Sequence, residues 1–132
     1  MAKTSKIEIR RVLTSTPLAR QHELRLEKER RRPKIPFSSF RRGDYPEAAL
    51  ELAFNAQLAL AAGEYGAVDL FARIASAMTL GGAPFDLVAE ASRIVSDEIR
   101  HADYCYRMAE LCGERQAVST FDTTGFIRIS AG

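Results

Sequence analysis

Three residues in the middle of the chain have the types and the spacing of a metal site. Glu98 and His101 form an E-x-x-H triplet on the apolar side of a helical pattern, and Glu64 lies 34 residues upstream on another apolar face. An ionised carboxylate rarely enters a helical core without a partner, because burying an unpaired charge is costly or shifts its pKa. For two carboxylates and an imidazole that converge between helices, a metal ion is a natural partner.

Two long helices are needed to position these residues. About residues 47–80 contain no proline, and apolar side chains recur through them at helical spacing. Residues 81–84, Gly-Gly-Ala-Pro, predict a tight turn, and a second helix then covers about residues 85–111 and stops at Gly113. Helices joined by so short a turn run antiparallel as a hairpin. We expect Asp44 to cap the first helix.

The three residues are predicted to lie at the same height in this hairpin. Glu64 lies about 18 residues before the centre of the turn, and Glu98 and His101 lie about 16 and 18 residues after it. At a rise of about 1.5 Å per residue, all three are about 24–28 Å from the turn. The hairpin therefore offers two carboxylates and one imidazole to a shared interior.

These residues resemble the ferritin-like di-iron carboxylate superfamily. In that fold one Glu comes from each of two helices and an E-x-x-H from each of the other two. Residues 64–73 (EYGAVDLFAR), 81–84 (GGAP) and 97–101 (DEIRH) are similar to bacterial ferritin-like-domain proteins. The resemblance covers roughly residues 46–113 and implies an all-α fold, in which the hairpin is half of a four-helix bundle.

The resemblance also implies a chemistry. Glu64, Glu98 and His101 would be both the metal ligands and the catalytic residues, with Glu98 bridging two iron ions, Glu64 terminal and His101 donating its imidazole. Manganese is the alternative metal. The implied activity is ferroxidase-like, an oxidation of Fe(II) by dioxygen or peroxide. Ferritins often carry a Tyr seven residues after the first Glu, where this chain has Phe71. Two tyrosines are candidate substitutes or ordinary packing residues: Tyr65 and Tyr104.

The sequence departs from the family because no second Glu and no second E-x-x-H follow His101. A homodimer or a higher homo-oligomer would supply the missing half, since two copies about a two-fold axis bring two of each ligand. A truncated family member without catalysis is an alternative. Another is a non-enzymatic helical interaction module that uses a basic arm to bind an anionic partner.

The charge distribution divides the chain. Residues 1–42 hold 13 Lys/Arg and 4 Asp/Glu, whereas the remainder holds 6 and 13. We therefore separate a basic, poorly ordered N-terminal arm (1–43), the helical hairpin (44–113) and a short C-terminal tail (114–132). In the arm, residues 18–32 predict a short polar helix and residues 6–10 a strand that nothing nearby pairs with. Residues 126–129 suggest an edge strand in the tail.

Several partners and compartments are disfavoured. Residues 20–42 are basic and aromatic enough to contact nucleic acid, but no helix-turn-helix or zinc spacing accompanies them, so a solvated arm is the favoured interpretation. Docking of the arm on the acidic hairpin or on a neighbouring subunit is the alternative. No secretory signal or 18-residue apolar stretch occurs, which indicates no membrane association. Cys105 and Cys112 are about 10 Å apart along one helix, too far for a disulfide, and two free thiols suit a cytoplasmic protein.

The second helix is predicted to have one solvated face. Its stripe of charged side chains lies opposite the apolar stripe and includes Asp97, which points away from Glu98. In the first helix, Glu47 and Glu51 are expected at the surface. The solvated stripe of the second helix comprises Arg93, Asp97, Arg100, Asp103, Arg107 and Glu110.

Overall fold

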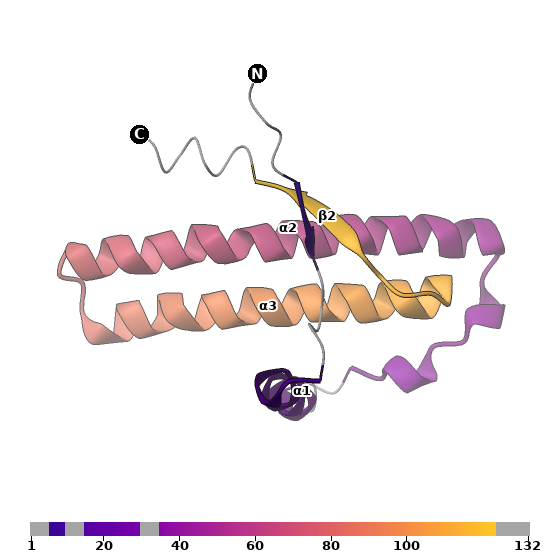
Figure 1. The fold of residues 1–132 in the computed structure, drawn as a ribbon, viewed down its shortest axis with the longest axis horizontal. Coiled ribbons are helices and arrows are strands. Elements are labelled where there is room, and N and C mark those ends of the chain that lie inside the picture. Colours follow the sequence, from indigo (N-terminus) through magenta and orange to yellow (C-terminus); the bar gives the residue numbers. More distant parts are fainter. Residues whose placement is uncertain (1–5, 10–14, 30–34, 124–132) are drawn as a thin grey trace, which may run out of the picture.

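The computed structural model describes residues 6–9, 15–29 and 35–123. Within these residues the chain is mostly helical, so the predicted all-α class is confirmed at this level. Two long helices dominate, and a short helix and a two-stranded ribbon flank them (Figure 1). No helix in the described ranges is long and apolar enough to cross a membrane. The elements are β1 (Lys6–Ile9), α1 (Pro17–Glu29), the 3-10 turns η1 (Phe37–Ser39) and η2 (Arg42–Asp44), α2 (Glu47–Leu80), α3 (Phe85–Gly113) and β2 (Ser119–Asp122).

Helices α2 and α3 lie side by side and run in opposite directions (Figure 1). Their boundaries at the turn are those that the Gly-Gly-Ala-Pro segment predicts. Gly82 has a φ of 72°, in the left-handed region that glycine adopts without the penalty of a side chain. The Ala83 N–H donates to the Met78 carbonyl at 2.9 Å, which closes the turn.

The start of α2 differs from the prediction, because Asp44 does not cap it. Asp44 belongs to η2, where its N–H donates to the Arg41 carbonyl at 3.1 Å. Tyr45 precedes a proline and is extended, because residues before a proline avoid the helical region. The extended Tyr45 places Asp44 away from the start of α2. Pro46 is the flanking residue, and no side chain caps α2.

The end of α3 also differs. The sequence alone places the stop at Gly113, whereas Gly113 is the last residue of α3 and Glu114 takes the left-handed position with φ 49°. Glycine at position 113 is required by packing, not by conformation. A Cβ there would lie 2.4 Å from Cδ2 of Phe54.

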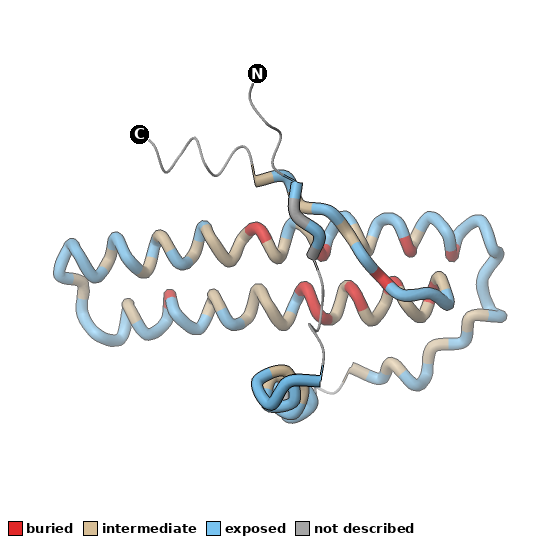
Figure 2. The backbone as a smooth tube through the Cα atoms, in the orientation of Figure 1, coloured by how far each residue is buried: buried red, intermediate tan, exposed pale blue. Residues whose placement is uncertain are grey.

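The hydrophobic core lies in the half of the hairpin remote from the α2–α3 turn (Figure 2). Burying a side chain such as Leu50 or Phe54 contributes about 1.5–3 kcal/mol, so this half holds the two helices together. At the turn, by contrast, Leu80 is 87% exposed and Phe85 is 95% exposed. The buried cluster comprises Leu50, Phe54, Ala61, Tyr106, Ala109, Cys112 and Ala117.

The N-terminal strand, for which the sequence offers no partner nearby, has a partner far along the chain. Strand β1 pairs antiparallel with β2, with Lys6 opposite Asp122 and Ile9 opposite Ser119. The two strands come from opposite ends of the sequence, and the ribbon crosses α2 (Figure 1). Hence the arm forms a strand at β1 and a helix at α1. Helix α1 matches the polar helix predicted for residues 18–32. The strand suggested for residues 126–129 lies outside the described residues.

One residue of the predicted solvated stripe is buried. Asp103 is only 3% exposed, and it accepts a hydrogen bond from Nε of Arg107 at 3.1 Å. Arg107 also lies 3.8 Å from the carboxylate of Glu23 in α1. The N-terminal helix thus reaches this side of α3, which periodicity within α3 alone does not reveal.

Candidate metal centre

The middle of α2 and the middle of α3 bring the three predicted ligands together. Nδ1 of His101 lies 3.6 Å from Oε2 of Glu64 and 3.8 Å from Oε2 of Glu98. One potential ligand atom from each residue lies within 4.8 Å of the other two. Because helical rise is constant, equal sequence distance from the turn places these side chains at equal height.

Burial changes across the cluster. The side chain of Glu98 is 12% exposed, that of Glu64 is 33% exposed and that of His101 is 45% exposed. Glu98 therefore lies between the helices, while His101 stands at one face of the hairpin. A ligand held here is reached from that face.

Electrostatics disfavour two free carboxylates in this place. A hydrogen bond with Glu64 raises the pKa of Glu98 above its ordinary value, and burial and the negative charge of Glu64 act in the same direction. The charge of His101 opposes this rise. Two carboxylates that share a site hold a proton more tightly, and a cation that replaces the proton relieves their repulsion.

The donor set fits a divalent metal of the iron or manganese type. Oxygen and nitrogen ligands lie about 2.1 Å from such ions, so two donors of one ion are about 3 Å apart when adjacent and about 4.2 Å apart when opposite. The observed limit of 4.8 Å requires only a small closure of the side chains. Two carboxylates and one imidazole leave positions open for further ligands.

A thiol lies near this cluster. Cys105 is one helical turn beyond His101, and burial together with the negative charge of Glu64 raises its pKa. The thiol is therefore held protonated and is not a ready nucleophile. Both Cys105 and Cys112 are free, as predicted.

The two tyrosines considered as redox groups both make ring contacts. Tyr65 meets Phe121 edge-on with ring centroids 5.6 Å apart, and Tyr104 meets Phe37 at 6.1 Å. These contacts favour the packing interpretation for both. Phe71, which the resemblance places where ferritins often carry a tyrosine, is partly buried.

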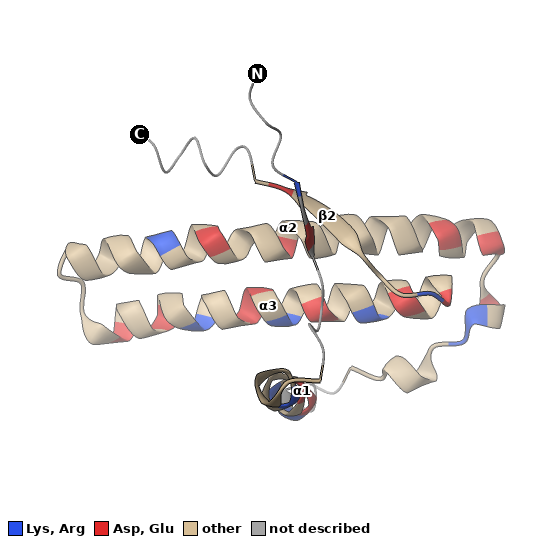
Figure 3. Ribbon diagram, viewed as in Figure 1, with Lys and Arg blue, Asp and Glu red and all other residues tan. Residues whose placement is uncertain are grey.

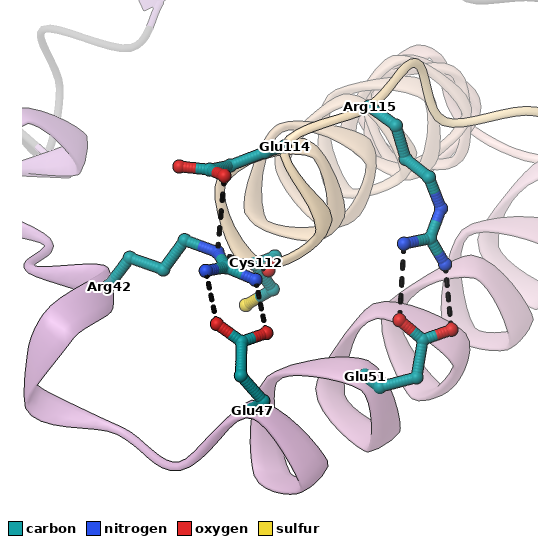
Figure 4. Close-up of polar contacts among 6 residues, drawn as sticks. All are labelled: Arg42, Glu47, Glu51, Cys112, Glu114 and Arg115. Carbon is teal, nitrogen blue, oxygen red and sulfur yellow. Dashed lines mark hydrogen bonds and ion pairs between the residues drawn. The ribbon is translucent and has the colours of Figure 1, made fainter.

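The predicted surface carboxylates of α2 lie outside the cluster and pair with arginines at the open end of the hairpin. Arg42 binds both oxygens of Glu47, at 2.6 and 2.7 Å, and donates to the carbonyl of Cys112 at 3.0 Å (Figure 4). Its guanidinium also lies 3.9 Å from Glu114. The bidentate contact lowers the pKa of Glu47. The sequence favours a solvated arm for Arg42, whereas the structure shows the alternative, in which this part of the arm docks on the acidic hairpin.

A second arginine reinforces the same end. Arg115 binds both oxygens of Glu51, at 2.8 and 3.1 Å, and its guanidinium lies 3.6 Å from the ring centroid of Phe54 (Figure 4). The aromatic residues of the basic segment are also engaged, because Phe40 and Tyr45 stack on one another at 5.6 Å. Within the described residues, Arg42 and Arg115 therefore hold the start of α2 against the end of α3.

No family model, curated protein or solved structure matches the chain. Membership of the ferritin-like superfamily therefore stays a prediction from residues 64–73, 81–84 and 97–101. The geometry of Glu64, Glu98 and His101 does not depend on that resemblance.

Proposed function

We propose that this protein is a ferritin-like metal-binding protein that oxidises Fe(II) with dioxygen or peroxide. One observation carries the proposal: Glu64, Glu98 and His101 meet with one ligand atom each within 4.8 Å. The largely buried side chain of Glu98 and its raised pKa support a site built for a cation.

The residues take distinct parts in this proposal. Glu98, the least exposed of the three, would bridge two metal ions, Glu64 would be a terminal ligand and His101 would donate an imidazole nitrogen. When bound, iron or manganese supplies one-electron redox chemistry. With hydrogen peroxide as the oxidant, two Fe(II) ions each lose one electron, and the peroxide takes up two electrons and two protons and becomes two waters.

Two hairpins together make the proposed four-helix bundle. The described residues supply two carboxylates and one imidazole, which is half of the ligand set that the ferritin-like fold uses. A second copy would bring its own Glu64, Glu98 and His101 to the partly exposed face where His101 stands. A homodimer with two-fold symmetry is the simplest such assembly.

The test combines metal content with native mass. The full chain is loaded with Fe(II) or Mn(II) without oxygen, and metal per chain is measured beside the mass of the assembly. We expect about one metal per chain in a dimer, and loss of most metal in Glu98→Ala and His101→Ala. Glu90→Ala is the matched control, because Glu90 lies on the exposed side of the same helix beside Arg93.

The redox part has its own readout. Oxygen or peroxide consumption on addition of Fe(II) should be rapid in the wild type and in Glu90→Ala, and should fall to the background rate in Glu98→Ala. A wild-type chain that holds no metal, or metal content untouched by both ligand variants, would sink the proposal. Metal binding without Fe(II) oxidation would retain the site and remove the activity.

A further inference from the structure

A pocket of about 220 Å³ lies where residues 37–45 meet the start of α2 and the end of α3. Two buried residues form its floor, Leu50 from α2 and Cys112 from α3, which are 3% and 2% exposed. Tyr45 and Ala49 are exposed and form its mouth. The pocket is therefore a hollow at the edge of the hydrophobic core that is open on one side. Its described lining comprises Phe40, Tyr45, Ala49, Leu50, Ala53, Met108 and Cys112.

Small side chains on α2 leave this space free. Ala49 and Ala53 are one helical turn apart and both line the pocket, so they lie on the same side of the helix. The residues that follow each of them, Leu50 and Phe54, belong to the buried cluster. Protein interiors are ordinarily close-packed, so a hollow of this size beside a well-filled core leaves room for a ligand.

The pocket is uncharged. No charged residue lines it among the residues that the structure describes. Charged residues surround this end of the hairpin (Figure 3), but Arg42 is bound to Glu47 and Arg115 to Glu51. Nε of Arg42 donates to the carbonyl of Cys112, which also occupies this guanidinium (Figure 4).

The thiol on the floor is also neutral. Burial raises the pKa of Cys112, although the charge of Arg42 acts in the opposite direction. A charged ligand would therefore lose its water and find no free counter-charge in the pocket, which is costly. An uncharged ligand meets no such penalty.

The walls of the pocket favour a flat ring. Phe40 and Tyr45 both line it, and their rings are nearly parallel, with an interplanar angle of 10° and centroids 5.6 Å apart. Aromatic rings pack well on such surfaces in offset or edge-on geometry. Met108 of α3 adds a thioether sulfur, which also makes favourable contacts with ring edges.

We propose that this pocket binds a small, uncharged aromatic molecule of one or two fused rings. An engineered apolar cavity of about 150 Å³ in another protein stays dry and binds benzene, so a pocket of about 220 Å³ has room for a somewhat larger ring system. The site is distinct from the metal cluster, because Met108 lies about 10 Å beyond His101 along α3. The proposal goes beyond the proposed function and does not depend on it.

The test uses the metal-free full chain and 2-naphthol, an uncharged two-ring phenol. Methionine methyl groups labelled with carbon-13 report where the ring binds in nuclear magnetic resonance spectra. We expect a saturable shift of the Met108 methyl signal, because aromatic ring currents act at short range. Met78, close to the α2–α3 turn at the other end of the hairpin, is the internal reference and should not shift.

Two variants fill the pocket. Ala53→Leu places three more carbon atoms inside it, and we expect the affinity for 2-naphthol to fall by about tenfold or more, since a ring forced into the narrowed space is overpacked. Ala49→Leu acts at the exposed mouth, so it tests the same idea without disturbing the core. Ala48→Leu is the matched control, because Ala48 is exposed on the same turn of α2 and does not line the pocket.

Charge selectivity is tested with naphthalene-2-sulfonate, which has the same rings and a permanent negative charge. We expect it to bind about tenfold more weakly than 2-naphthol or worse, because its charge has no free partner in the pocket. Equal binding of the two compounds would overturn the preference for an uncharged ligand.

The site itself is overturned if the Met108 signal does not shift saturably, or if Ala53→Leu and Ala49→Leu both bind 2-naphthol as tightly as Ala48→Leu does. A native dimer that takes up no 2-naphthol, but does so once dilution separates its chains, would show that a second copy occupies the pocket and would also overturn the proposal. A chain that binds 2-naphthol at Met108 but holds no iron or manganese retains this site and loses the proposed function.

Discussion

Gly113→Ala should destabilise the protein, although replacing a helical glycine with alanine ordinarily stabilises. The new Cβ would lie 2.4 Å from Cδ2 and 2.9 Å from Cε2 of Phe54, where ordinary contact begins at 3.4 Å. The ring edge must therefore move by about 1 Å. Its freedom is limited, because Phe54 is 6% exposed and the guanidinium of Arg115, itself bound to Glu51, is stacked on it.

The size of the effect follows from two opposing contributions. Overpacking a core costs about 1–3 kcal/mol, and alanine gains at most about 1 kcal/mol of helix propensity over glycine. We expect a net loss of up to about 2 kcal/mol in the free energy of unfolding of Gly113→Ala, or a fall of up to about 6 °C in Tm. Urea and thermal unfolding of the metal-free chain, followed by circular dichroism, measure both.

Gly63→Ala is the matched control. Gly63 is exposed in the middle of α2, and nothing lies within 4 Å of an added Cβ, so this variant should gain about 1 kcal/mol. Shortening the ring should relieve the clash, and Gly113→Ala combined with Phe54→Leu should lose less than the sum of the two single variants. Equal gains in Gly113→Ala and Gly63→Ala would refute the packing argument.

Three further outcomes follow from the geometry. Because the pKa of Glu98 is raised in the folded protein, the folded chain holds the Glu98 proton up to a higher pH than the unfolded chain does. The stability of the metal-free protein therefore falls as the pH rises from 4.5 through that higher pKa. Glu98→Gln should remove this slope in unfolding titrations. Gly82→Ala places a side chain at φ 72° and should cost about 1 kcal/mol, read as a lower urea midpoint; an unchanged midpoint contradicts the left-handed turn. Asp103→Ala leaves Arg107 without its 3.1 Å partner and should lower the free energy of unfolding by about 1–3 kcal/mol. A loss below about 0.5 kcal/mol, which is typical of surface sites, would show that water replaces the carboxylate.

Local features of the fold were predictable. The turn at residues 81–84 follows from its glycines and proline, and the lengths of α2 and α3 follow from proline-free apolar periodicity. Helical rise is the same in every helix, so counting residues from the turn was enough to place Glu64 beside Glu98 and His101.

Capping and exposure were harder to predict. Asp44 has the right type for an N-cap, but the extended Tyr45–Pro46 pair directs it elsewhere. Asp103 has the periodicity of a solvated residue, yet it is buried in a part of α3 that α1 also reaches. In each case a neighbour outside the helix overrides the preference of the residue.

The sequence by itself determined the two helices, the turn between them and the common height of the three candidate ligands, because each depends on residues within one helix or one turn. Only the tertiary structure decided the pairing of Lys6 with Asp122, the requirement for glycine at position 113 and the clamp of Arg42 on Glu47 and Cys112. The first two and the Cys112 contact join residues distant along the chain, whose meeting depends on how every intervening element packs.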